Sequence, residues 1–165
     1  MKQTLIIFGT RKGTTETTAK VLAETLLLKH KHHVEIVNVK SIKKYKRKLQ
    51  DFDNLIVGSS IVSGKWVSRA LKFLKKNSFQ DQQVAIFVTA GGTLNKQAKY
   101  GLSKKEAISE AITKYIDKYL PRFKFVPVSK IAFGGRVVRS GIEKYNSWNR
   151  NDIENWANNL GKLFN

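Results

Sequence analysis

Short apolar runs alternate with longer amphipathic stretches along this chain. The runs are too short for typical helices and end at glycine or polar residues, which is typical of strands buried in a sheet. Five runs predict five strands, over Leu5–Phe8, Val34–Val39, Asp53–Ser59, Val84–Thr89 and Phe125–Phe133. Because strands that alternate with helices form parallel sheets covered on both faces, the pattern predicts an α/β protein.

The stretches between the runs carry apolar residues at the three- and four-residue spacing of helices. The first of them spans Ala19–Leu28. Ser103 and Glu106 have the spacing of a capping box and predict the start of another helix. Asn151 or Asp152 is expected to cap the last one.

The loop after the first predicted strand is rich in hydroxyl side chains. Residues 10–15 read Thr-Arg-Lys-Gly-Thr-Thr, and the first predicted helix follows. The first N–H groups of a helix lack intrahelical partners and lie at the positive end of its dipole, so this arrangement predicts an anion site. Arg11 and Lys12 add positive charge, and phosphate is the anion that we expect. An ordinary strand-to-helix turn capped by threonines is the alternative.

Two common phosphate-binding motifs do not fit this loop. A P-loop has four residues between its glycines, whereas Gly9 and Gly13 enclose three. The dinucleotide-binding fingerprint needs a third glycine that is missing here.

Three loops of small residues follow the first, third and fourth predicted strands. In an open parallel sheet, ligands bind outside the carboxyl ends of the strands, where the strand order reverses. We therefore expect these loops to form one site, with these candidate residues: Thr10, Arg11, Lys12, Gly13, Thr14, Thr15, Ser59, Ser60, Ile61, Gly64, Lys65, Trp66, Thr89, Ala90, Gly91 and Gly92.

Three sequence patterns carry a resemblance to a known family. They are Thr10-x-x-Gly13-x-Thr15, then Gly58-Ser59-Ser60-Ile61-x-x-Gly64, and finally Asp152-x-x-x-Trp156-Ala157. Together they resemble the flavodoxin-domain family, which includes the quinone-dependent protoporphyrinogen dehydrogenase of bacteria. The resemblance implies a flavodoxin-like, three-layer, doubly wound sheet of five parallel strands in the order 2-1-3-4-5. It also implies FMN as cofactor, with its phosphate on residues 10–15 and its ring between the loops 59–66 and 89–93.

Aromatic and aliphatic side chains stack on flavin rings. Trp66 and Ile61 are the candidates for one face of the ring, and Tyr100 is a weaker candidate for the other. A helix-start residue packed on the core is the alternative interpretation of Trp66.

Composition restricts the chemistry further. The 165 residues suit one domain spanning 1–165, and the absence of cysteine excludes thiolate catalysis, disulfides and cysteine-ligated metals. Any redox chemistry must therefore reside on a bound cofactor. We expect His30, His32 and His33, which lie among lysines, to form a solvated helix end, and we predict no metal site. With no visible leader peptide or membrane span, we expect a cytoplasmic protein.

The net charge of +19 is the unusual feature of the composition. The densest basic cluster is Lys43–Lys48. Such a balance indicates an anionic partner, namely an anionic membrane surface, an acidic redox protein, a small anionic substrate or nucleic acid. With no duplex-reading motif visible, we expect no sequence-specific nucleic-acid binding. Simple solvation by lysine is the alternative, and the oligomeric state stays open.

These observations leave three functional hypotheses. The first is an FMN-dependent oxidoreductase of the protoporphyrinogen dehydrogenase type, with substrate propionates near Lys65, Arg136 and Arg139. The second is a flavodoxin-like electron carrier for an acidic redox partner. The third is a basic binding module without cofactor. The connection from Gly134 to Arg150 is long, and we expect it to contribute to function.

Overall fold

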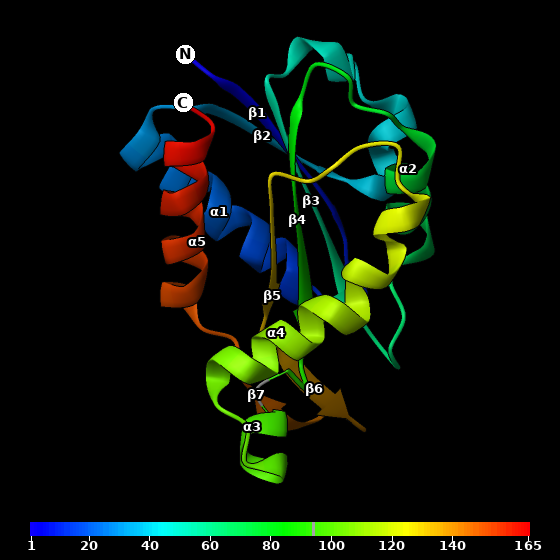
Figure 1. The fold of residues 1–165 in the computed structure, drawn as a ribbon, viewed down its shortest axis with the longest axis vertical. Coiled ribbons are helices and arrows are strands. Elements are labelled where there is room, and N and C mark those ends of the chain that lie inside the picture. The colour runs from blue at the N-terminus through cyan, green and yellow to red at the C-terminus, as the bar shows by residue number, and fades with distance from the viewer. Residues whose placement is uncertain (94) are drawn as a thin grey trace.

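The computed structural model describes residues 1–93 and 95–165, and it has a central sheet with helices on both sides (Figure 1). The five strands are parallel and follow the order β2-β1-β3-β4-β5, so the predicted fold class is confirmed. They are β1 (Gln3–Gly9), β2 (His33–Asn38), β3 (Asn54–Ile61), β4 (Gln83–Ala90) and β5 (Ser129–Phe133). A separate antiparallel hairpin consists of β6 (Arg136–Arg139) and β7 (Ile142–Asn146).

Helices and short 3-10 segments connect the strands. The helices are α1 (Thr14–His30), α2 (Ser68–Lys76), α3 (Asn95–Tyr100), α4 (Lys104–Tyr115) and α5 (Arg150–Leu163). The 3-10 segments are η1 (Val39–Lys44), η2 (Leu49–Asp51) and η3 (Asp117–Arg122). Among the described helices, none combines the length and the apolar composition needed to cross a bilayer.

Strand β1 lies inside the sheet, paired with β2 on one edge and with β3 on the other. Its Ile6 is opposite Ile36 of β2 and Ile56 of β3. Leu5, Ile6 and Ile7 are completely buried. Helices cover both faces of this strand, which explains why its sequence is a continuous apolar run instead of an alternating one.

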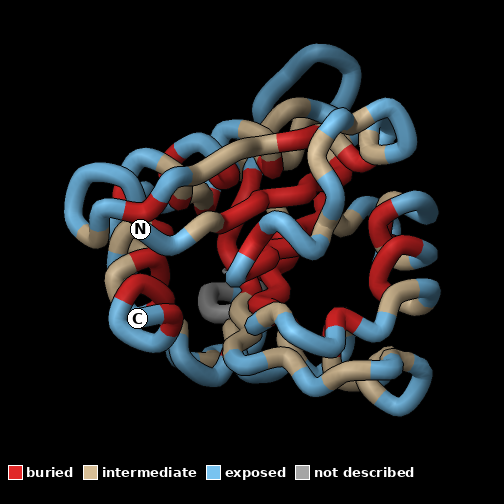
Figure 2. The backbone as a smooth tube through the Cα atoms, turned by 90° about the horizontal axis from the view of Figure 1, so that it is seen from above, coloured by how far each residue is buried: buried red, intermediate tan, exposed pale blue. Residues whose placement is uncertain are grey.

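Two hydrophobic cores lie on opposite sides of the sheet, and buried residues occupy the middle of the molecule between exposed outer segments (Figure 2). On the side of α1 and α5, the rings of Phe87, Phe133 and Trp156 contact one another at centroid distances of 5.6, 5.9 and 6.2 Å. On the other side, α2, α4 and the 3-10 segments pack around β3 and β4. Helices α1 and α5 therefore lie on one side of the sheet, and α2, α4 and the 3-10 segments lie on the other.

Some element boundaries differ from the prediction. The last strand of the sheet begins at Ser129 and not at Phe125, because the Phe125 ring packs against Phe79 in the core, with 4.9 Å between ring centroids. Helix α1 begins at Thr14, five residues before the predicted Ala19.

Side-chain caps define two helix starts. The capping box of Ser103 and Glu106 is present, so this prediction is confirmed. The cap of α5 is Asn149, whose Oδ1 accepts from the Asp152 N–H at 3.2 Å. The prediction of Asn151 or Asp152 as the cap was therefore wrong.

The prediction of a solvated helix end was wrong for His32. This side chain is only 1% exposed, and its Nδ1 lies 2.9 Å from the Thr4 Oγ1. Its ring also packs near Phe164, and the neighbouring His30 Nε2 lies 3.1 Å from the Asn158 Oδ1. The two histidines therefore join the end of α1 to β1 and to α5.

Burial lowers the pKa of His32 below its usual 6.5. The nearby charges of His30 and Lys2 act in the same direction, whereas Asn165 and Asp53 oppose the shift. The unfolded chain therefore binds a proton at His32 more readily than the folded protein does.

We predict that the free energy of unfolding decreases as the pH falls from about 7 to about 5. Above the pKa that His32 has in the unfolded chain, its full contribution to the free energy of unfolding is present. As the pH falls below that pKa toward the lower pKa of the folded state, this contribution is lost, by up to about 1.4 kcal/mol per pH unit. His32→Gln should flatten this dependence in urea unfolding measured at several pH values. The exposed His33→Gln is the control and should retain it. Equal slopes in wild type and His32→Gln would contradict the assignment.

Candidate functional site

The carboxyl ends of β1, β3 and β4 meet at one edge of the sheet. Gly9 is opposite Ser59, and Ser60 is opposite Thr89 in the strand register. The three loops predicted to form one site therefore do come together. The strand order reverses between β1 and β3, which is the position where ligands bind in open α/β sheets.

The loop from Thr10 to Gly13 turns the chain sharply into α1. Gly13 has a φ of 90°, a conformation that favours glycine. The Thr10 Oγ1 accepts from the Gly13 N–H at 2.9 Å and closes the turn. Helix α1 begins at Thr14, so the N–H groups of its first turn have no preceding helical carbonyl to bind. They remain available to an anion.

The two cations of the loop bind backbone carbonyls of the neighbouring walls. Arg11 donates to the carbonyl oxygens of Lys65, at 3.0 Å, and Trp66, at 2.6 Å. Lys12 Nζ donates to the Val138 carbonyl of the hairpin at 3.0 Å. These side chains tie the loop to the segment after β3 and to the hairpin. Their positive charge also stays at the mouth of the site.

Four buried hydroxyl groups lie near this edge of the sheet. Thr15 Oγ1 and Thr89 Oγ1 lie 2.7 Å apart, and both residues are buried. Ser59 Oγ accepts from the Val67 N–H and so has a structural partner. The Ser60 Oγ, in contrast, is buried without a hydrogen-bond partner among the described residues. An orphaned buried hydroxyl is costly unless a ligand or water completes it.

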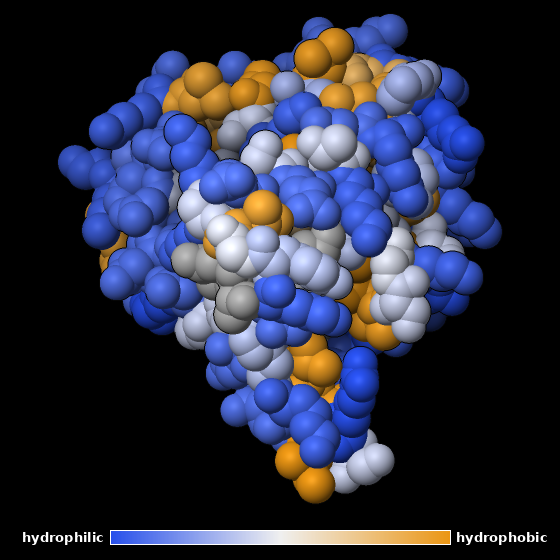
Figure 3. Space-filling model, turned by 60° about the horizontal axis from the view of Figure 1, so that its bottom comes forward, coloured by the Kyte–Doolittle hydropathy of each residue, from blue (hydrophilic) through white to orange (hydrophobic). Residues whose placement is uncertain are grey.

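Two adjoining hollows open at this edge, on a face where hydrophilic side chains predominate (Figure 3). The narrow one, of about 40 Å³, lies over the loop 10–14 and reaches Ser60 and Thr89. The wider one, of about 560 Å³, is bounded by Lys12, by residues 61–64 and 90–92, and by the hairpin. Its volume is in the range of pockets that hold small-molecule ligands.

Most of the predicted site residues line these hollows. They are Thr10, Arg11, Lys12, Thr14, Ser60, Ile61, Gly64, Thr89, Ala90, Gly91 and Gly92. The predicted residues that line neither hollow are Gly13, Thr15, Ser59, Lys65 and Trp66.

Trp66 does not face the wider hollow, so the prediction that its ring stacks there was wrong. The side chain is 3% exposed, and its Nε1–H donates to the Tyr115 carbonyl at 2.7 Å. Its ring meets Tyr119 edge-to-face in the core. Tyr100 also lies outside the described lining, whereas the half-buried Tyr115 and Tyr145 belong to it.

The hairpin β6–β7 forms a wall that was not predicted as a hairpin. Ser147 anchors its base, because its Oγ accepts from the Gly135 N–H at 3.1 Å. Val137 packs so closely that a Cβ at Gly91 would lie 2.5 Å from it. The signal was present in the sequence as the Ser140-Gly141 pair between two short β-branched or aromatic runs, which is typical of a two-residue hairpin turn.

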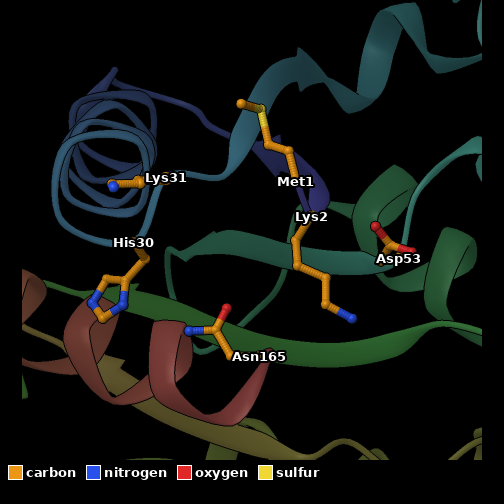
Figure 4. Close-up of a pocket in the computed structure, with 6 residues that line it drawn as sticks. All are labelled: Met1, Lys2, His30, Lys31, Asp53 and Asn165. Atoms are coloured by element: carbon orange, nitrogen blue, oxygen red, sulfur yellow. The ribbon is translucent and has the colours of Figure 1, made fainter.

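A further hollow of about 480 Å³ lies at the opposite, amino edge of the sheet. Its lining side chains do not converge: Lys2 extends toward Asp53, and Lys31 points away from both (Figure 4). The described residues also contain no group of three His, Asp or Glu side chains that could hold a metal ion. The carboxyl edge is therefore the candidate site.

The sheet order and the loop before α1 define a protein of the flavodoxin-like class. The family model of the flavodoxin domain matches residues 5–162, so the chain belongs to the flavodoxin domain family. No curated protein sequence matches the chain significantly.

Solved flavodoxins share the fold at low sequence identity. The Streptococcus pneumoniae TIGR4 flavodoxin has a TM-score of 0.61 and 15% identity, with 98% of this chain and 99% of that chain covered. A short-chain flavodoxin associated with a non-canonical PDU bacterial microcompartment has a TM-score of 0.60, 13% identity and 100% coverage of both chains. The Fusobacterium nucleatum flavodoxin, solved bound to flavin mononucleotide, has a TM-score of 0.57, 16% identity and 100% coverage of both chains.

Proposed function

We propose that the carboxyl-edge site binds FMN and that the protein is a flavodoxin-like redox protein. The observation that carries this proposal is that the two hollows adjoin and share lining residues. The narrow hollow over residues 10–14, where we expect an anion to bind, therefore lies directly beside the cavity of about 560 Å³. Membership of the flavodoxin domain family supports it, and so does the related fold of a flavodoxin solved with FMN.

The residues present fit the phosphate of FMN. Thr14, the first residue of α1, and Lys12 line the narrow hollow. We expect the first N–H groups of α1, the Thr14 hydroxyl and the charge of Lys12 to hold the phosphate there. The Ser60 hydroxyl, which lacks a protein partner among the described residues, lines the same hollow. Charge-assisted hydrogen bonds of this kind are about twice as strong as neutral ones.

The wider hollow suits a flat aromatic ring. Ile61 and Gly64 lie on one wall, and Gly91 and Gly92 on another. Tyr145 of the hairpin lines the same hollow, and we expect it, rather than Trp66, to be the aromatic side chain beside the ring. FMN, when bound, supplies the ability to accept and return electrons. The residues of the wider hollow would hold and orient the ring.

We predict that the apoprotein binds FMN at least about tenfold more tightly than riboflavin, which lacks the phosphate. Thr14→Val should weaken FMN binding by about 1.5–3 kcal/mol and leave riboflavin binding unchanged, because it removes a donor to the phosphate alone. Flavin fluorescence quenching in a titration measures both affinities.

The exposed Thr113→Val on α4 is the matched control and should bind FMN like the wild type. Equal affinities for FMN and riboflavin would contradict the proposal that residues 10–15 bind the FMN phosphate. Binding of neither flavin would favour the basic binding module without cofactor.

The rim of the wider hollow favours a reaction partner with negative charge. Arg136, Arg139 and Lys144 of the hairpin are exposed there. Arg136 pairs with Glu143 at 2.6 Å, whereas Arg139 and Lys144 have no carboxylate within 4.0 Å among the described residues. This charge suits the acidic surface of a redox partner protein. It also suits the propionates of a small substrate, which keeps the protoporphyrinogen dehydrogenase type as a second candidate function.

Anaerobic mixing with protoporphyrinogen separates these candidates. A dehydrogenase should lose its flavin absorption with protoporphyrinogen and react much more slowly with the dimethyl ester, which lacks the carboxylates. Arg139→Gln with Lys144→Gln should then slow the reaction with the acid but not with the ester. An electron carrier should keep its flavin absorption with both compounds.

A further inference from the structure

The two sides of the sheet differ sharply in charge. Helices α1 and α5, which cover one side, carry four cations and four carboxylates. The segments 39–51, Ser68–Lys76, Lys104–Tyr115 and 117–130 pack on the other side and carry seventeen cations and four carboxylates. We call the surface of these four segments the basic face. It accounts for +13 of the net charge of +19.

The two sides also differ in how many of their cations are paired. Among the described residues, two of the four cations of α1 and α5 lie within 4.0 Å of a carboxylate, whereas three of the seventeen on the basic face do, namely Arg47, Lys104 and Lys130. On α1 and α5, Lys20 lies 3.7 Å from Glu16, and Arg150 lies 2.6 Å from Glu24. Helix α2, in contrast, has four cations and no carboxylate, and none of its cations lies within 4.0 Å of a carboxylate in the described part of the chain. Uncompensated like charge destabilises a folded protein by self-repulsion. A surface of this kind is best explained by an anionic partner.

The residue types on the basic face indicate which partner. Fourteen of its seventeen cations are lysines. Arginine is enriched in protein interfaces and in base recognition, where its planar fork binds fixed acceptors, whereas lysine is depleted in protein interfaces. Lysine is a point charge on a flexible stem and needs no fixed geometry. A diffuse anionic layer is therefore a better partner than a structured protein surface.

The three tyrosines of the basic face all have partners within the protein, and the Tyr45 ring stacks on Phe52. Lys75 and Lys118 lie over the Tyr119 ring, at 5.5 and 5.0 Å from its centroid. Lys114 lies over the Tyr115 ring at 5.5 Å. Single-stranded binding depends on open aromatic platforms, which these rings do not offer.

The basic face also carries exposed apolar side chains. Val126 is 88% exposed and Val128 is 39% exposed, and they lie in sequence between Lys124 and Lys130. Apolar side chains flanked by lysines can enter the headgroup region while the lysines contact lipid phosphates. We propose that the basic face docks the protein on the anionic surface of a lipid bilayer.

The proposed docking surface lies close to the candidate FMN site. Tyr115 lines the wider hollow and belongs to the core under the basic face. The wider hollow therefore adjoins the core under the basic face at this residue.

Vesicle sedimentation tests the proposal with two triple variants of equal net charge. Lys72→Gln with Lys76→Gln and Lys124→Gln changes exposed residues of the basic face. Lys20→Gln with Lys29→Gln and Lys162→Gln changes exposed residues of α1 and α5. The probes are phosphatidylcholine vesicles with and without about 30% phosphatidylglycerol.

We expect the wild type to bind only the vesicles with phosphatidylglycerol, and less tightly as salt rises from about 50 to 200 mM. The basic-face variant should bind about 100-fold more weakly, since each cation near an anionic surface contributes roughly a fivefold increase in affinity. The α1 and α5 variant should bind nearly as tightly as the wild type.

Equal loss in both variants, or equal binding to neutral vesicles, would overturn the proposal. Tight binding to a DNA duplex at about 150 mM salt, lost in the basic-face variant and without vesicle binding, would replace lipid by nucleic acid. FMN titration of the same variants is independent of these outcomes, because the changed residues do not line the site.

Discussion

The parallel pairing of β1 with both β2 and β3 is the constraint on which the rest of the structure depends. Because β1 has a partner on each edge, the chain must cross the sheet in opposite directions after β1 and after β2. Helix α1 therefore covers one side, and η1 and α2 cover the other. The same reversal opens the crevice at the carboxyl edge, where the loops after β1, β3 and β4 meet.

The cations of this molecule fall into two structural groups. Arg11 and Lys12 donate hydrogen bonds to backbone carbonyls of the segment after β3 and of the hairpin, so they tie the loop before α1 to both. The lysines of the basic face make few such bonds. They act over distance and with little geometric demand, which is the behaviour expected of a surface that approaches a diffuse charge. Arg11 and Lys12 help to shape the candidate site, and we propose that the lysines of the basic face hold the protein at an anionic lipid surface.

Fold class and loop convergence could be predicted because they depend on local pattern. The apolar run of β1 and the threonine- and glycine-rich loop after it are readable without any partner. Trp66 shows where such reasoning fails. Its position after a small-residue loop suggests an exposed ring, but α4 and η3 cover it. These segments lie far along the chain, and their packing on Trp66 cannot be inferred from the local sequence. His32 was misjudged for the same reason, since α5 buries it from far along the chain. The hairpin was missed although its Ser140-Gly141 turn was visible, because its length suggested a loop.

The most direct test of the FMN site is the mapping of backbone amide shifts by ¹H–¹⁵N NMR as FMN is added to the apoprotein. If FMN binds at the carboxyl edge, the largest changes fall on Thr14 and Thr15, on Gly91 and Gly92, and on Tyr145 of the hairpin. Changes centred instead on Lys2, His30 and Lys31 would place the ligand at the amino edge and contradict the account.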